Sequence, residues 1–303
     1  MNPALMTRGK VLITGRHGFT GHYVARALSA AGWQVWSMSN HAPADPDPHD
    51  RVADLTDAAA VAAAIADIRP DAVVHLAAIA FVAHGSADDF YRVNLMGTRN
   101  LLEALVHEGC GAQGVVLASS ANIYGNTRIS PIPETAQPAP ANDYAVSKLA
   151  MEHVAELFAG KLPLVIARPF NYTGVGQASK FLVPKIVAGF RERAPRLELG
   201  NLDVARDFSD VRDVAQVYRA LLESEDARGE TVNICSGHAT SLQEIVGLCR
   251  KLSGHDLEIV VNPDFVRDDE IKVLKGDPTR MTALTPGLTR HGFKDTLRWM
   301  LEA

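Results

Sequence analysis

The sequence is poor in cysteine and has no long hydrophobic run. Its 303 residues include only three cysteines, Cys110, Cys235 and Cys249, too few and too scattered for a disulfide framework or a zinc site. The longest apolar segment, VVHLAAIAFVA over 73–83, is about half the ~20 residues that cross a bilayer. The N-terminus lacks the apolar stretch and cleavage site of a secretory signal. We therefore expect buried thiols, no bound metal, no membrane partner and a cytoplasmic location.

The sequence also lacks an excess of basic residues. Its 30 Lys and Arg are outnumbered by 35 Asp and Glu, which gives a net charge of −5. Nucleic-acid-binding surfaces usually carry a basic excess or basic clusters, so we expect no nucleic-acid partner. The hydrophobic fraction of 47% is ordinary for a globular protein. A small-molecule ligand is the remaining expectation.

Short apolar runs alternate with amphipathic stretches along the first half of the chain. The runs predict strands over 10–14, 33–38, 71–77, 114–120 and 162–169, and the stretches predict helices over 19–31 and 89–108 and from Asn142. Uninterrupted Val, Ile and Leu is typical of buried parallel strands. The pattern indicates an α/β fold with a Rossmann-like, doubly wound parallel sheet.

The second half of the chain is more turn-rich. It predicts helices over 179–193, 210–223 and 240–252, and a strand over 230–237 that returns to the first sheet. We therefore predict a dinucleotide-binding domain over 1–168 plus 209–237. A smaller, interleaved substrate lobe is predicted over 169–208 plus 238–303.

The segment TGRHGFTG, at 14–21, lies between a predicted strand and a predicted helix. Gly15 permits a tight turn, Gly18 lets the backbone approach a pyrophosphate, and Gly21 allows close helix packing. The helix N-terminus adds free N–H donors. The alternative is a glycine-rich turn with no ligand, but the context favours a dinucleotide held by this loop, including His17, Phe19 and Thr20.

No acidic residue occurs between Gly21 and Asp45, where an NAD site usually places one to bind the ribose 2′-hydroxyl. The second strand ends instead in SMSNH. The side chains that could bind a 2′-phosphate are Arg16, Ser39, Asn40 and His41, although Arg16 and His41 could equally be solvated loop residues. NADP(H) is favoured and NAD(H) is possible. Asp54 and Leu55, after a short third strand, are expected near the adenine.

Tyr144 and Lys148 lie at positions i and i+4 of the helix that follows Asn142, and therefore share one face. Ser119 and Ser120 end a predicted strand, at the sheet edge where such folds bind ligands. A tyrosine with a pKa near ~10 can act near neutrality only if its pKa is lowered, which a neighbouring ammonium favours. The alternative is an interface tyrosine and a strand-end turn.

These motifs, with HLAA (75–78), NLMGTRNLLEA (94–104), SSANIYG (119–125) and YAVSK (144–148), resemble the extended short-chain dehydrogenase/reductase family. Its members are NAD(P)-dependent epimerases and dehydratases of nucleotide sugars. The resemblance implies a catalytic triad of Ser120, Tyr144 and Lys148, with Lys148 also binding the nicotinamide ribose. It adds coenzyme contacts from Leu76, Ala77, Ala78 and Arg168. Asn94 would be a structural or relay group, and His75 a core histidine.

The C-terminal half is similar to one branch of that family, the GDP-mannose 4,6-dehydratases and, more closely, the GDP-4-keto-6-deoxy-D-mannose reductases. The segments that carry this similarity are ARPFNYTGVGQ (167–177), GNLDVARDFSDVRDV (200–214) and VRDDEIKVLKGDPTRM (266–281). The resemblance implies a GDP-linked nucleotide-sugar substrate, bound by Ser120, Asn122, Asn171, Arg206, Arg267 and Glu270.

Asn122 occupies the position at which dehydratases of this branch carry a glutamate base, which disfavours dehydration because an amide cannot take a proton. The remaining expectation is reduction of a 4-keto group to GDP-D-rhamnose or to its C4 epimer GDP-6-deoxy-D-talose. The alternatives are a 4-epimerase with retained NAD, a GDP-mannose 4,6-dehydratase-like enzyme, and a coenzyme-sensing protein without activity. The resemblance also implies a homodimer formed through the helices at 88–108 and 143–160.

Overall fold

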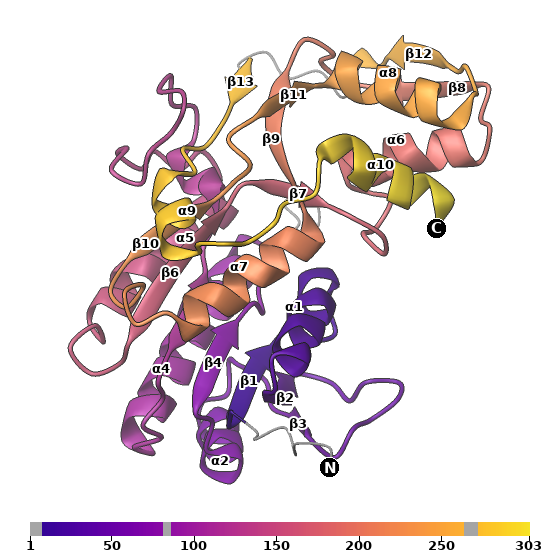
Figure 1. Cartoon of the computed structure of the whole chain (residues 1–303). Helices are drawn as coiled ribbons and strands as arrows, with labels where there is room; N and C mark the ends of the chain where they lie inside the picture. Colours follow the sequence, from indigo (N-terminus) through magenta and orange to yellow (C-terminus); the bar gives the residue numbers. More distant parts are fainter. Residues whose placement is uncertain (1–7, 81–85, 264–271) are drawn as a thin grey trace.

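A seven-stranded parallel sheet forms the centre of the protein, in the order β10-β6-β5-β4-β1-β2-β3 (Figure 1). The computed structural model describes residues 8–80, 86–263 and 272–303. The strands are β1 (Lys10–Thr14), β2 (Gln34–Ser39), β3 (Asp50–Val52), β4 (Ala72–His75), β5 (Val115–Ala118), β6 (Leu164–Pro169) and β10 (Thr231–Ile234). This order confirms the doubly wound fold, with β10 returning to the sheet as predicted.

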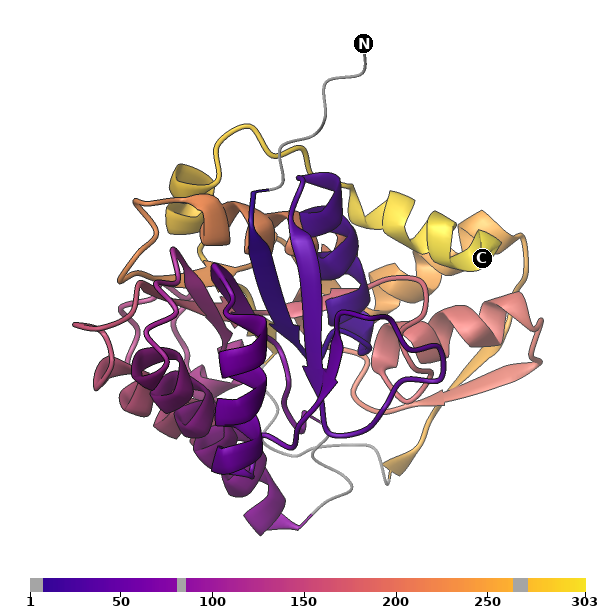
Figure 2. The same cartoon turned by 90° about the horizontal axis from the view of Figure 1, so that it is seen from below.

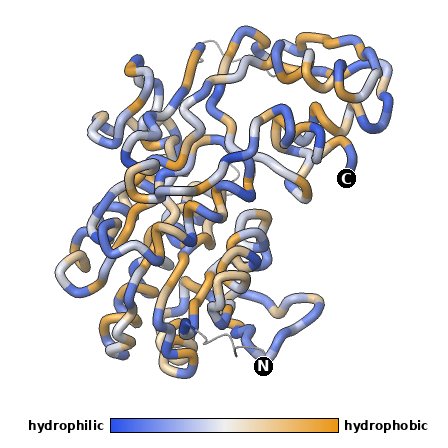
Figure 3. The backbone as a smooth tube through the Cα atoms, viewed as in Figure 1, coloured by the Kyte–Doolittle hydropathy of each residue, from blue (hydrophilic) through white to orange (hydrophobic). Residues whose placement is uncertain are grey.

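Helices cover both faces of this sheet because the strand side chains alternate between two apolar cores. In β1, Val11 and Ile13 face one core and Leu12 faces the other. The first core is covered by α1 (Phe19–Ala30) and α7 (Val211–Glu223), and the second by α2 (Ala58–Ile68), α4 (Thr98–His107) and α5 (Asp143–Glu156). Figure 2 shows the sheet between these helical layers, and Figure 3 shows hydrophobic residues concentrated along its strands.

The second lobe is built from short strands that the sequence did not predict. A four-stranded sheet joins β7 (Asn171–Thr173), β9 (Ala205–Asp210), β11 (Ala239–Ser241) and β13 (Val273–Leu274), and a two-stranded sheet joins β8 (Arg196–Leu199) and β12 (Glu258–Val261). Helices α6 (Leu182–Arg191), α8 (Leu242–Ser253) and α10 (Phe293–Glu302) enclose a separate core with them. Helix α9 (Thr279–Leu284) instead returns Met281 to the core of the large sheet.

The helix predicted over 89–108 is interrupted. It comprises α3 (Ala87–Phe90), a π-helical segment (Tyr91–Gly97) and α4. The π segment positions Asn94. The side-chain amide of Asn94 accepts a hydrogen bond from the Ile79 N–H group and donates to the Ile79 carbonyl and the Ser147 hydroxyl. Such insertions often occur at functional sites. Among the described residues, no helix is long and apolar enough to cross a membrane.

Candidate active site

The loop between β1 and α1 has the geometry that a dinucleotide pyrophosphate requires. Gly15 has a φ of +73°, and a Cβ there would lie 2.9 Å from the backbone nitrogen of Ala77. A Cβ on Gly21 would lie 2.1 Å from the carbonyl oxygen of Gly15, so the helix packs too closely for any side chain. Gly18 precedes α1, and within the described chain no side chain caps its first N–H groups. These donors suit a phosphate.

The side chains of Ser120, Tyr144 and Lys148 meet at the carboxyl end of β5. Asn142 caps α5 through a 2.9 Å bond from the Ala145 amide, which starts the helix so that Tyr144 and Lys148 lie one turn apart. Both are buried, with 8% and 2% of their surface exposed. Ser120 follows β5 and caps the short 3₁₀ helix Ala121–Tyr124. The Lys148 ammonium donates a 2.7 Å hydrogen bond to the Ala118 carbonyl.

Burial dominates the acid–base properties of this group. It raises the pKa of Tyr144 to about 12, although the hydrogen bond with Ser120 opposes the shift. Burial also lowers the pKa of Lys148 to about 8, against the opposing charge of Glu152. The phenol is therefore protonated near neutral pH and is a proton donor rather than a base. We expected Lys148 to lower the pKa of Tyr144. In this structure, burial of the phenol is the largest effect and raises that pKa.

A cleft of about 540 Å³ runs from the glycine loop past these side chains into the second lobe. Its lining includes many of the predicted residues: Gly15, Gly18, Phe19, Thr20, Gly21, Leu76, Ala78, Ser120, Asn122, Tyr144, Lys148, Asn171 and Arg206. The sequence did not indicate Tyr172, Tyr218 and Leu274, which line it as well. Tyr172 follows the RPFN motif directly, and its hydroxyl lies 2.8 Å from that of Thr20. Its place directly after the RPFN motif is the sequence signal that could have identified Tyr172.

Arg168 does not line the cleft, contrary to its predicted coenzyme contact. Its guanidinium forms bonds of 3.0 and 2.6 Å with the Glu152 carboxylate and a 2.9 Å bond with the Tyr124 hydroxyl. Glu152 also accepts a hydrogen bond from Ser119. Arg168 is 8% exposed, so it joins β6 to α5 inside the protein. The prediction for this residue is corrected to a structural role.

Other predicted coenzyme contacts lie beside the cleft and not in its lining: Arg16, His17, Ser39, Asn40, Asp54, Leu55 and Ala77. Leu55 is part of the core under α2. Asp54 accepts hydrogen bonds of 2.8 Å from the amide and hydroxyl of Thr56, so it fixes the turn before α2. Ser39 donates to the carbonyl of His41. Arg16 and His17 are in the glycine loop and Ala77 follows β4, whereas the other four lie at the end of β2 or after β3.

An acidic residue that the sequence analysis missed lies beside the glycine loop. Asp50 begins β3, and the pairing of β3 with β2 sets it opposite Ser37. Its carboxylate accepts a hydrogen bond from Ser37 and a 3.1 Å bond from Arg16, and lies 3.3 Å from His17. Burial tends to raise the pKa of Asp50, but the bond from Ser37 and the charge of Arg16 outweigh it, so the pKa is lowered. Arg16 is therefore ion-paired.

His75 connects the coenzyme side of β4 to its neighbours. Thr98 donates its hydroxyl hydrogen to the Asn94 carbonyl, so it accepts from Nε2 of His75 at 2.8 Å. Nδ1 of His75 then accepts from Thr14 at 2.7 Å, and Thr14 accepts from the Ala77 amide. Burial lowers the pKa of His75 to about 3, with the charge of Lys148 adding to the effect. This neutral histidine holds the Ala77 segment against Gly15.

Two predicted substrate residues lie in the second lobe. β7 and β9 are parallel neighbours, so Asn171 and Arg206 lie on adjacent strands at the far side of the cleft. Asn171 is exposed and Arg206 is half-buried. An amide donor and a guanidinium in this position suit a diphosphate. Arg267 and Glu270 lie outside the described residues.

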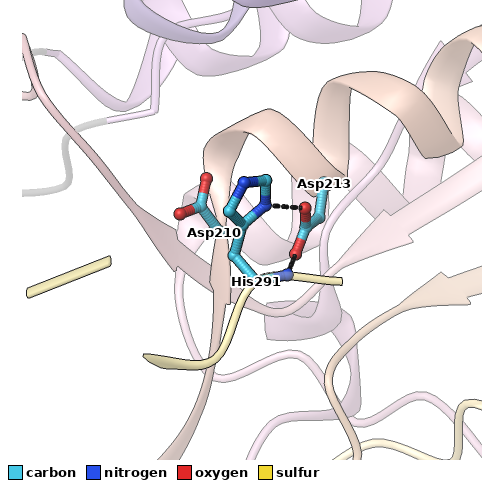
Figure 4. A group of neighbouring side chains, drawn as sticks. All are labelled: Asp210, Asp213 and His291. Carbon is cyan, nitrogen blue, oxygen red and sulfur yellow. Dashed lines mark hydrogen bonds and ion pairs between the residues drawn. The ribbon is translucent and has the colours of Figure 1, made fainter. Parts of the chain in front are cut away.

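Asp210, Asp213 and His291 form a second polar group, in the lining of a separate pocket (Figure 4). His291 donates to Asp213 from Nδ1 at 2.5 Å and from its backbone at 2.7 Å. Asp210 already accepts four bonds, three from Arg212 and one from Thr296. Its lone pairs are thereby used, so this group fastens α7 to the segment before α10 and does not offer a cation a ligand set.

Residues 11–235 match the NAD dependent epimerase/dehydratase family, and the chain belongs to it. This is the extended short-chain dehydrogenase/reductase family, whose members are NAD(P)-dependent enzymes of nucleotide sugars. The chain is 36% identical to GDP-6-deoxy-D-talose 4-dehydrogenase of Aggregatibacter actinomycetemcomitans, over 90% of each protein. It is 33% identical to GDP-6-deoxy-D-mannose reductase of Pseudomonas aeruginosa, over 96% of each. The solved structure of RMD from Pseudomonas aeruginosa complexed with NADPH is 32% identical and matches with a TM-score of 0.85, over 98% of this chain and 97% of the other.

Proposed function

We propose that this protein reduces the 4-keto group of GDP-4-keto-6-deoxy-D-mannose. The observation that carries the proposal is the buried, protonated phenol of Tyr144 beside Ser120, in a cleft that also contains the glycine loop. Reduction of a ketone requires a proton donor at its oxygen, and a phenol with a pKa of about 12 remains protonated at neutral pH. The two curated relatives named above act on the two C4 epimers that such a reduction gives.

The mechanism assigns one role to each side chain. Ser120 donates a hydrogen bond to the C4 carbonyl oxygen and orients it toward Tyr144, which then donates its phenolic proton to that oxygen. A reduced nicotinamide supplies the hydride when bound. Lys148, held by the Ala118 carbonyl, provides a cation that binds ribose hydroxyls and stabilises the phenolate that remains. Asn122 supplies an amide and no base, so water is not eliminated.

The coenzyme and the sugar diphosphate would be held at opposite ends of the cleft. Gly15, Gly18 and the first turn of α1 would bind the coenzyme pyrophosphate, and Asn171 and Arg206 the diphosphate of the substrate. We propose NADPH as the preferred reductant and NADH as a weaker one. Arg16 is in the glycine loop and could bind a 2′-phosphate, but it also forms an ion pair with Asp50.

The test is to mix the protein with enzymatically prepared GDP-4-keto-6-deoxy-D-mannose and to follow loss of NADPH or NADH absorbance. Tyr144→Phe keeps the ring and removes the proton, so it should lower kcat by about 10²–10⁴-fold while coenzyme still binds. NMR of the product assigns the C4 configuration as GDP-6-deoxy-D-mannose or GDP-6-deoxy-D-talose. An absence of turnover with both coenzymes would refute the proposal.

The competing function is a 4-epimerase that retains NAD. The matched relatives include dTDP-L-rhamnose 4-epimerase of Burkholderia thailandensis, 30% identical over the whole chain. Release of stoichiometric NAD⁺ from the denatured protein, with interconversion of C4 epimers, would favour the epimerase. We also propose a homodimer, which sedimentation analysis of the purified protein tests directly.

A further inference from the structure

Tyr218 differs from the other tyrosines of the chain. The sequence has six, and five have a hydrogen-bond partner for the phenol. Among the described residues, the Tyr218 hydroxyl has no hydrogen-bond partner, and its oxygen is accessible from the cleft. Only 1% of the residue is exposed, yet it lines the cleft. Because this hydroxyl reaches the cleft, it can hydrogen-bond a molecule that is bound there.

Its position points to the catalytic end of the cleft. Tyr218 is in α7, which packs beneath β4, β5 and β6, and its ring lies in the core with Val74 and Ala118. Burial raises its pKa well above the usual value, and the phenols of Tyr172 and Tyr144 add to the shift because they are close. The hydroxyl is therefore a neutral donor and acceptor near Tyr144.

We infer that the Tyr218 hydroxyl hydrogen-bonds the nicotinamide riboside half of the coenzyme. The carboxamide and ribose hydroxyls of that half are neutral donors and acceptors that match a neutral phenol. The inference rests on the proposed function, since it assumes a nicotinamide coenzyme in this cleft. It adds a coenzyme contact from α7, on the face of the sheet opposite the α5 helix that carries Tyr144.

Tyr218→Phe tests the inference because it removes only the hydroxyl. The dissociation constant for NADPH, measured by coenzyme fluorescence, should rise about three- to tenfold, the usual effect of one lost hydrogen bond. The inhibition constant of ADP, which lacks the nicotinamide riboside, should not change. Because no hydrogen bond within the protein is lost, the urea unfolding midpoint should also stay the same.

Tyr124→Phe is the matched control. Tyr124 is an equally buried tyrosine, but its hydroxyl bonds Asn233 at 2.7 Å and Arg168 at 2.9 Å. Its variant should lose stability and keep the affinity for NADPH. A folded Tyr218→Phe protein with unchanged NADPH affinity, or with ADP weakened equally, would overturn the inference. A wild-type protein that binds neither NADPH nor NADH would refute the proposed function instead.

Discussion

Asp50 and Arg16 form an ion pair of 3.1 Å across the start of β3 and the glycine loop. The side chain of Asp50 is 5% exposed and that of Arg16 is 25% exposed, so solvent screens the pair only in part. A 2′-phosphate that binds Arg16 would also meet the negative charge of Asp50. We therefore expect Asp50 to weaken the proposed preference for NADPH without abolishing it.

Asp50→Asn should shift the coenzyme preference toward NADPH. The substitution removes the carboxylate charge but keeps an oxygen for Arg16, so repulsion of the 2′-phosphate falls while the loop stays in place. We expect the ratio of kcat/KM for NADPH to kcat/KM for NADH to rise about three- to tenfold. Asp47→Asn, which removes an exposed charge from the same segment, is the control. A ratio that falls would mean that Asp50 instead holds Arg16 in its phosphate-binding position.

The pH dependence of reduction should report Lys148. Its pKa of about 8 lies below that of Tyr144, about 12, so the ammonium is lost first as the pH rises. We expect kcat/KM, which reports the free enzyme, to fall tenfold per pH unit above about pH 8. Lys148→Arg, if active, should move that fall above pH 10, because a guanidinium keeps its charge. A wild-type profile that is flat to pH 10 would contradict this assignment.

His75 should make the fold sensitive to acid. Its pKa of about 3 in the fold lies below the ordinary value of 6.5, so the unfolded chain binds more protons between these values. The contribution of His75 to the free energy of unfolding is fully present above pH 6.5 and is lost as the pH falls toward 3. Between pH 7 and pH 5 the loss should be about 2 kcal/mol, measured by urea unfolding.

His75→Gln should be less stable than wild type at pH 7, because the bonds to Thr14 and Thr98 are disturbed, but less sensitive to acid. His107→Gln is the control, since 86% of that side chain is exposed. If His75→Gln loses the same free energy between pH 7 and pH 5 as wild type does, another group causes the acid sensitivity.

The sequence predicted the large sheet well because its strands carry their own signal. Val11, Leu12 and Ile13 are apolar on both faces of β1, and the glycine loop follows at once. Asp50 was missed because its neighbours Ser37 and Arg16 are set by the pairing of β3 with β2, which leaves no local pattern. The short strands of the second lobe were missed for the same reason: their partners are distant in sequence.

Two side chains show the limit within the site itself. Arg168 is the penultimate residue of β6, and the resemblance implied a coenzyme contact for it. It instead pairs with Glu152, which lies on the same helix as Lys148. Tyr218 belongs to an amphipathic helix whose apolar residues pack in the core, so its spacing alone suggests an ordinary core aromatic. The partner of Arg168 is known only from the folded structure. The same is true of the Tyr218 hydroxyl, which has no partner among the described residues.

Alanine substitutions at Gly18, Gly21 and Gly160 should separate effects on coenzyme binding from effects on folding. At Gly160 a Cβ would meet nothing within 4 Å, so this variant should behave as wild type. At Gly18 the nearest atom would be the Gly15 carbonyl oxygen at 3.3 Å, which a small shift relieves, so the protein should fold. The added methyl would still face the coenzyme pyrophosphate and weaken NADPH binding at least tenfold. At Gly21 the same oxygen would lie at 2.1 Å, so unfolding in urea should show a loss of several kcal/mol. Equal NADPH affinity for the Gly18 and Gly160 variants would show that the pyrophosphate does not approach this loop.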